Sequence, residues 1–335
     1  MAGAARLKIA DRISMATTPQ PDSVVRVPEL PNGWQAVNYA ILQDGLLAIL
    51  AANVDLVSEW KRDERGGPIG DPYKVAETAE AKIFTVGGNS VDGSSVFPLL
   101  TPFPSFDRFP DGRWLVVGGR TRGKPSARII EKDGSVETPF MLGDGIEHMK
   151  IDERGSIWVG WFDEGVYGND SWRLEGHEWP PSAYGVAAFS ERGEILSFAP
   201  SPPANGHISD CYALNVIGSD AWTCTYGEFP ILRMSDDGKA QWWETQLSGP
   251  RALAIQLPYI LAVGGYSDDG DTAVLLKLEG NATSELGRWR LPLNVGFPNQ
   301  VELIDGRGES IFAIQDSTMR RWHIGNFVEA VGHSS

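Results

Sequence analysis

This 335-residue chain has few of the features that mark membrane, secreted or disulfide-rich proteins. No apolar run approaches the roughly 18 residues of a membrane-spanning helix. The first twenty residues lack the continuous apolar core of a secretion signal. Only two cysteines are present, Cys211 and Cys224, which excludes a disulfide framework. We expect both as free thiols and the protein in the cytoplasm.

Positive charge is also scarce. The chain has 29 Lys and Arg against 44 Asp and Glu, for a formal net charge of −15. This excess argues against a nucleic-acid phosphate track and against binding to an anionic membrane surface. The partners that remain are a small polar molecule or another protein.

Helical periodicity is nearly absent, and residues 72–81 are the one stretch where helical turns are predicted. The 38 Gly and 22 Pro instead separate many short apolar runs, as in an all-β chain. A strand–turn–strand unit recurs, most clearly at residues 147–169 (EHMKIDERGSIWVGWFDEGVYGN). The turns of the copies lie at Asp44-Gly45, Asp111-Gly112, Arg154-Gly155, Ser219-Asp220, Leu257-Pro258 and Asp305-Gly306.

The copies follow one another at intervals of about 40–70 residues, the spacing of four-stranded propeller blades with insertions. We therefore predict a single domain over residues 1–335, an all-β six-bladed β-propeller. A seventh blade arises if residues 82–98 form a blade of their own. The last repeat lacks a strand after residues 319–324. We expect the N-terminal region, residues 1–20 and especially 7–14, to supply it and close the ring.

Propeller topology places the loops between the second and third strands of each blade on the face where the innermost strands begin. Two long insertions, residues 55–81 and 165–184, leave from such loops and are expected to roof that face. Polar residues that gather there predict an axial site. Glu147-His148 and Asp163-Glu164 stand at the two ends of one hairpin and are the candidate catalytic residues, as an acid–base set.

The same face suggests ligands for a metal and for a substrate. Glu147, Asp163, Asp210 and Glu302 offer carboxylates suited to Ca²⁺ or Mg²⁺. Candidate substrate-binding residues are Arg120, Arg251, Trp161, Asp210 and Gln300, the arginines for a carboxylate or phosphate. The structural alternatives stay open: Asp163 and Glu164 cap backbone N–H groups, His148 packs in the wall, the arginines offset nearby carboxylates, and Trp161 packs between sheets.

Three blocks, WVGWFDEGVYGN, ISDCYALNV and YGEFPILR, resemble a family of uncharacterised bacterial propeller proteins. The phrases FPDGRWLVVGG and DERGSIWVG are similar, more distantly, to those of streptogramin-lyase, NHL and gluconolactonase-type propellers. The resemblance implies the fold and the location of the site. The Glu–Asn–Asp metal set of the gluconolactonase type has no residue-by-residue counterpart here, which disfavours a lactonase.

Three functions therefore remain open. The first is a metal-assisted hydrolase or lyase acting on a small polar molecule, favoured by the acidic axial face. The second is a ligand-binding or sensor propeller without catalysis. The third is a protein-interaction scaffold, because propellers host many functions.

Overall fold

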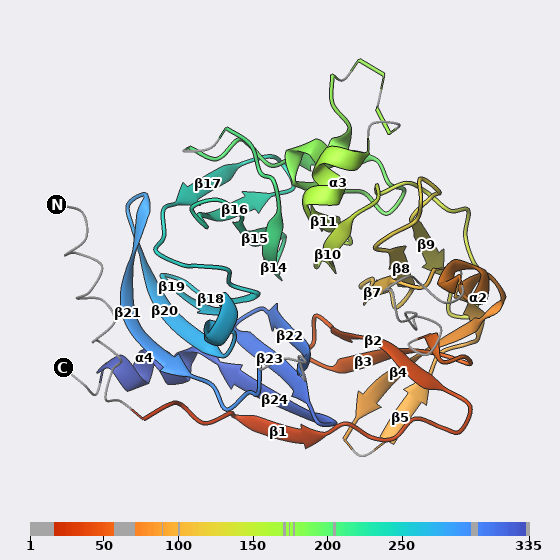
Figure 1. Ribbon diagram of the computed structural model, residues 1–335, viewed down its shortest axis with the longest axis horizontal. Coiled ribbons are helices and arrows are strands. Elements are labelled where there is room, and N and C mark those ends of the chain that lie inside the picture. The colour runs from red at the N-terminus through yellow and green to blue at the C-terminus, as the bar shows by residue number, and fades with distance from the viewer. Residues whose placement is uncertain are drawn as a thin grey trace, which may run out of the picture.

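The computed structural model describes residues 17–56, 71–88, 90–99, 101–169, 172–173, 175–176, 178–203, 206–295 and 301–332. Six antiparallel sheets stand around a central axis and form a six-bladed β-propeller (Figure 1). The innermost strands of successive blades pack against one another around the ring. The predicted fold class is confirmed.

The blades follow chain order. Blade 1 holds β2 (Gln35–Ile41), β3 (Leu47–Ala52), β4 (Glu80–Gly87) and β5 (Ser90–Gly93), with β6 (Phe97–Pro98) beside β4. Blade 2 holds β7 (Pro104–Arg108), β8 (Trp114–Gly118) and β9 (Ala127–Ile130). Blade 3 holds β10 (Ile146–Ile151), β11 (Ile157–Trp161), β12 (Val186–Phe189) and β13 (Ile195–Phe198).

Blade 4 holds β14 (Cys211–Ile217), β15 (Asp220–Thr225), β16 (Ile231–Ser235) and β17 (Ala240–Trp243). Blade 5 holds β18 (Ala252–Gln256), β19 (Tyr259–Val263), β20 (Thr272–Glu279) and β21 (Ala282–Arg290). Blade 6 holds β22 (Val301–Arg307), β23 (Ser310–Gln315) and β24 (Thr318–His323). Residues 82–98 belong to blade 1, so the alternative of a seventh blade is wrong.

The second strand of a blade is apolar because neighbouring blades cover it. All residues of β8 and β11 are buried. The turn before β11 is held by one carboxylate: Asp152 accepts hydrogen bonds from the backbone N–H groups of Arg154 and Ser156 and from the indole of Trp158. Gly155 closes this turn at φ 87°, a conformation that glycine adopts without strain.

The ring is closed by an N-terminal strand, but not by the segment predicted for it. β1 (Ser23–Arg26) pairs antiparallel with β24 and becomes the outer strand of blade 6. Residues 17–20 are not in a strand, and residues 7–14 lie outside the described part of the chain. Pairing one blade from both ends of the chain covers the edge that β24 would otherwise expose.

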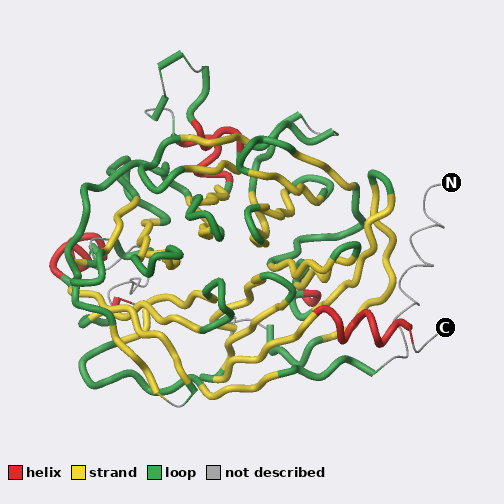
Figure 2. Tube along the Cα trace, turned by 180° about the vertical axis from the view of Figure 1, so that it is seen from behind, coloured by secondary structure: helices red, strands yellow, loops and turns green. Residues whose placement is uncertain are grey.

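Helices are few and lie on or around the ring. The helical turns expected at residues 72–81 are α2 (Pro72–Thr78), capped by the carboxylate of Asp71. Four other helical elements of the described residues were not predicted: α3 (Asp163–Gly168), the 3₁₀ turns Pro181–Tyr184 and Ser267–Asp269, and α4 (Ile324–Gly332). Seen from behind, α2 and α4 lie at the periphery of the strands (Figure 2). No helix in the described ranges is long and apolar enough to cross a membrane.

Both long insertions leave from the predicted kind of loop. The β3–β4 connection carries α2, and the β11–β12 connection carries α3 and the turn Pro181–Tyr184. Residues 57–70 of the first insertion lie outside the described residues. Because α2 and α3 follow second strands, they mark the face of the ring on which the innermost strands begin.

At the opposite end of the innermost strands, ion pairs link three blades. The guanidinium of Arg307 pairs with Asp107 at 3.1 Å and donates to the backbone carbonyl of Ile151 at 2.7 Å. Both side chains of this ion pair are almost fully buried, at 4% and 3% exposed. Lys150 adds a second pair with Asp305 at 2.7 Å. These bonds join β7, β10 and β22, which belong to three different blades.

Replacing Arg307 with Met should lower the free energy of unfolding by about 3 kcal/mol or more, because it leaves the carboxylate of Asp107 buried without its cation. The matched control is Arg108→Met, which breaks the partly exposed pair with Asp44 and should cost under about 1 kcal/mol. Urea denaturation measures both. Equal costs for the two variants would contradict a dominant role of the buried pair.

Candidate functional site

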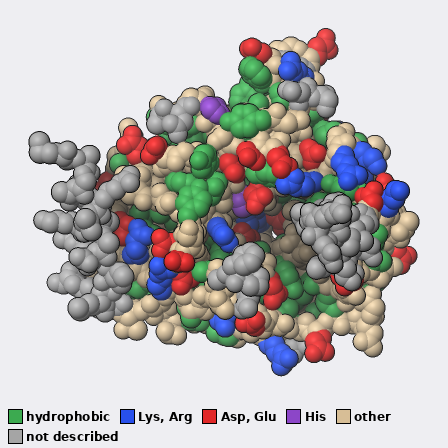
Figure 3. Space-filling view, in the orientation of Figure 1, with side chains coloured by type: hydrophobic (Ala, Val, Ile, Leu, Met, Phe, Trp, Pro, Cys, Tyr) green, Lys and Arg blue, Asp and Glu red, His purple; other side chains and the backbone are tan. Residues whose placement is uncertain are grey.

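A cavity of about 550 Å³ opens at the axis on the face that carries α3. Its wall includes Glu147 and His148 from β10 and Glu302 from β22. The other functional side chains of the wall are Arg120, Phe162, Asp210, Cys211, Tyr212 and Arg251. Figure 3 shows acidic and basic side chains gathered around a hollow near the middle of this face. A smaller cavity of about 200 Å³ shares Glu147 and His148 and reaches the floor at Lys150 and Asp305.

Backbone irregularities place several of these side chains. The pairing of the innermost strands with their neighbours shifts register at Val37, Glu147, Tyr212 and Glu302. A bulge of this kind turns a strand locally and re-aims the extra residue's side chain. The last three of these residues line the cavity. Regular alternation along the strands would not by itself have identified them.

The three wall carboxylates are Glu147, Asp210 and Glu302. Within the described ranges, none of them has an ion-pair partner. Burial, together with the charges of Glu147 and Asp163, raises the pKa of Asp210 to about 6. The site therefore concentrates negative charge that the protein itself does not neutralise.

Two groups near these carboxylates, His148 and Tyr39, have shifted pKa values. Burial lowers the pKa of His148 below its usual value, although Glu147 and Asp305 partly oppose the shift. The imidazole is therefore neutral at pH 7, and its Nε2 is buried without a hydrogen-bond partner in the described structure. Burial and the adjacent Glu302, to which the phenol is hydrogen-bonded, raise the pKa of Tyr39 to about 12.

The arginines differ in how they are engaged. Arg120 stacks on the ring of Phe162 at 4.8 Å and forms an ion pair with Glu164. Arg251 also lines the cavity, at the residue just before β18. With Arg120 already paired, the wall carries more negative than positive charge.

The structure separates the remaining candidates. Asp163 and Glu164 form the first turn of α3 and are absent from the cavity wall, and Asp163 accepts the backbone N–H of Glu164 at 2.7 Å. Trp161 is fully buried among Trp172 and Phe189, with its indole donating to the carbonyl of Leu142, so it is a core residue and not a substrate contact. Gln300 lies outside the described residues.

A metal centre does not emerge from this arrangement. Over the described ranges, no group of three or more His, Cys, Asp or Glu lies close enough to hold a metal ion. The expected set Glu147, Asp163, Asp210 and Glu302 therefore does not converge as ligands.

The cysteines do not add a nucleophile to the site, because burial raises the pKa of the Cys211 thiol to about 12. Both cysteines are free, as expected.

Aromatic side chains at the rim went unnoticed in the sequence. Tyr212 contacts the rings of Tyr226, Phe229 and Tyr266 at centroid distances of 5.2–6.0 Å. Tyr266 donates a hydrogen bond to the Tyr212 hydroxyl at 2.8 Å. The YGEFP segment could have signalled this cluster, because its aromatics directly follow an innermost hairpin.

Comparisons with known proteins identify the fold. No protein-family model matches the chain, and no curated protein matches it significantly. Virginiamycin B lyase from Staphylococcus aureus is similar over 89% of this chain and 97% of its own, at 10% identity and a TM-score of 0.50. Hsv2 of Kluyveromyces lactis matches 89% of this chain and 77% of its own, at 10% identity and a TM-score of 0.50. A putative gluconolactonase matches 91% of this chain and 97% of its own, at 11% identity and a TM-score of 0.48. At these identities the likeness extends to the propeller architecture alone.

The raised pKa of Asp210 makes a prediction about stability. Its value moves from 3.8 to about 6 in the folded protein, so the folded state binds this proton more tightly than the unfolded state does. The free energy of unfolding should therefore fall as pH rises between these values. Asp210→Asn should remove this dependence. The Tm of the variant minus the Tm of the parent protein should therefore increase as the pH rises from about 4 to about 7. A Tm difference that is the same at every pH would refute the assigned shift.

Proposed function

We propose that the protein binds a small polar molecule carrying a positively charged group in the axial cavity. The observation that supports this most is the set of wall carboxylates, Glu147, Asp210 and Glu302, which have no ion-pair partner in the described structure around about 550 Å³ of space. Like charges held together are costly, and a bound cation relieves that cost. The volume lies in the range of small-molecule sites.

The site geometry also suggests how a ligand would be oriented. An ammonium or guanidinium group would sit among the carboxylates, where charge-assisted hydrogen bonds are strongest. Tyr212 offers a ring face on the same wall, and aromatic faces attract cations. Arg251 is placed to donate hydrogen bonds to a polar or anionic end of the same molecule.

A matched series of four-carbon compounds tests the charge preference. Putrescine, 1,4-butanediol and succinate share a chain length and differ in charge. Putrescine should raise the Tm in a concentration-dependent way, and the other two should not, because only the diammonium complements the carboxylates. Isothermal titration calorimetry should show affinity for putrescine falling about tenfold or more in Glu147→Gln.

The control for that series is Glu153→Gln, which removes an exposed carboxylate from the turn at the opposite end of β10. It should leave putrescine affinity unchanged. Stabilisation by succinate instead would show that Arg120 and Arg251 dominate the cavity, and the proposal would be wrong.

A hydrolase or lyase acting on such a molecule is the second candidate function. One observation favours it: Asp210, whose pKa is raised to about 6, lines the same cavity as the neutral His148, and groups that titrate near neutral pH are suited to proton transfer. In this version Asp210 exchanges a proton with the bound molecule, and the neutral imidazole of His148 lines the same cavity. Both roles use the same cavity.

The metal expected from the sequence can be tested separately. Because the described carboxylates do not converge on one point, EDTA should leave the Tm unchanged, and Ca²⁺ or Mg²⁺ should not raise it. Differential scanning calorimetry measures this directly. A fall in Tm with EDTA that either cation reverses would restore the metal-assisted hypothesis.

A further inference from the structure

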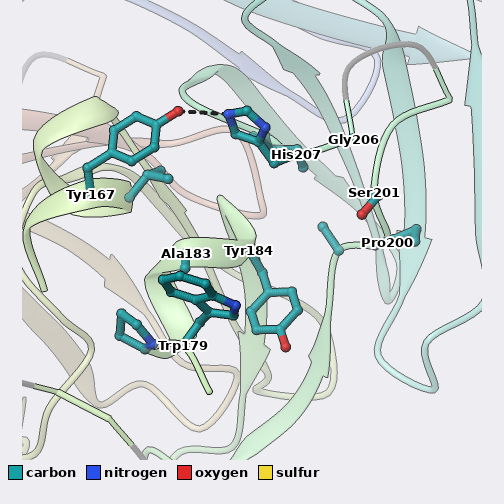
Figure 4. A pocket seen from close by; sticks show the side chains of 12 residues that line it. Tyr167, Trp179, Ala183, Tyr184, Pro200, Ser201, Gly206 and His207 are labelled. Carbon is teal, nitrogen blue, oxygen red and sulfur yellow. Dashed lines mark hydrogen bonds between the residues drawn. The ribbon is translucent and has the colours of Figure 1, made fainter. Parts of the chain in front are cut away.

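A second cavity lies outside the axial site on the same blade that carries α3. It encloses about 460 Å³ between the β11–β12 insertion and the segment that leads into β14. Its walls include Val166 and Tyr167 of α3, Trp179 and Tyr184 of the insertion, and His207. Figure 4 shows Trp179 and Tyr184 on one side of this space and the Tyr167–His207 pair on the other.

Exposed aromatic surface is concentrated here. Tyr167 is 59% exposed, Trp179 53% and Tyr184 36%. Ten large hydrophobic residues are exposed in the described part of the chain, and three of them line this one pocket. Single exposed apolar residues need no explanation, but a cluster around a concave space is typical of a binding site.

The pocket is built for a flat apolar body. Ala183, Ala199 and Pro200 line it with small apolar groups. Tyr184 stacks on Phe198 at a centroid distance of 4.2 Å and an interplanar angle of 19°, which holds the Tyr184 ring in place. A rigid aromatic wall loses little side-chain entropy when a second ring stacks against it.

A hydrogen-bonded pair of polar groups lies opposite this wall. The hydroxyl of Tyr167 and Nε2 of His207 lie 2.8 Å apart and are hydrogen-bonded (Figure 4). Such a pair can take one further hydrogen bond from a ligand hydroxyl, because a phenol oxygen both donates and accepts. The remaining lining is predominantly apolar, so a charged ligand would lose its hydration without compensation.

We propose that this aromatic pocket is a second ligand site, separate from the axial cavity, for a planar aromatic molecule that carries a single hydroxyl group. Trp179 and Tyr184 stack on the aromatic rings, and the Tyr167–His207 pair binds the hydroxyl. The ligand is uncharged, in contrast to the cation proposed for the axial cavity.

2-Naphthol is a suitable probe, because it has two fused rings and one hydroxyl and is itself fluorescent. Titration should show saturable binding of one molecule per chain. Trp179→Ala should weaken it about tenfold or more by removing a stacking wall. Leu196→Ala is the matched control, since Leu196 is 45% exposed on the neighbouring β13 and does not line the pocket. Tyr167→Phe should weaken binding several-fold and leave the binding of naphthalene unchanged.

Glu147→Gln separates this proposal from the axial one, because it should alter putrescine binding and leave 2-naphthol binding intact. Circular dichroism checks that Trp179→Ala is folded, and Tyr184→Leu gives a second test of the wall. No saturable binding of 2-naphthol overturns the proposal, as does equal weakening by Leu196→Ala. Binding of a proline-rich peptide without binding of 2-naphthol also overturns it, because the pocket would then be a peptide groove.

Discussion

The buried ion pair between Arg307 and Asp107 sets the geometry at the centre of the ring. It joins blades 2 and 6 across the axis, and the bond from Arg307 to the carbonyl of Ile151 adds blade 3. Since charge in a dry interior must be paired, this contact tolerates little displacement of the innermost strands. It lies at the end of the axis opposite the axial cavity.

Charge is handled in opposite ways at the two ends of the axis. At the floor, Lys150 and Arg307 neutralise Asp305 and Asp107. At the open end, bulges at Glu147 and Glu302 add carboxylates that no described cation neutralises. Burial, and the charges of Glu147 and Asp163, raise the pKa of Asp210 at this end. The segment before β14 lines both spaces, through Asp210 in the axial cavity and His207 in the aromatic pocket.

The sequence was sufficient for the fold because turns and apolar strands are local signals. The Asp152 turn and the fully buried β11 are readable in DERGSIWVGW. Glu147, Asp210 and Glu302 were placed on one face by topology alone, whereas the bulges that orient them depend on pairing between strands. Trp161 was misjudged because an apolar strand residue next to an insertion looks the same whether it faces the core or a pocket. The closing strand was placed too early, at residues 1–20 instead of Ser23–Arg26, because a short edge strand has little pattern of its own.

A crystal structure of the protein with putrescine at neutral pH tests the central claim most directly, that unneutralised carboxylates make the axial cavity a cation site. The account predicts an ammonium group within hydrogen-bonding distance of at least two of Glu147, Asp210 and Glu302. It would be contradicted by a structure in which those carboxylates pair with Arg120 and Arg251 and the cavity holds no diamine.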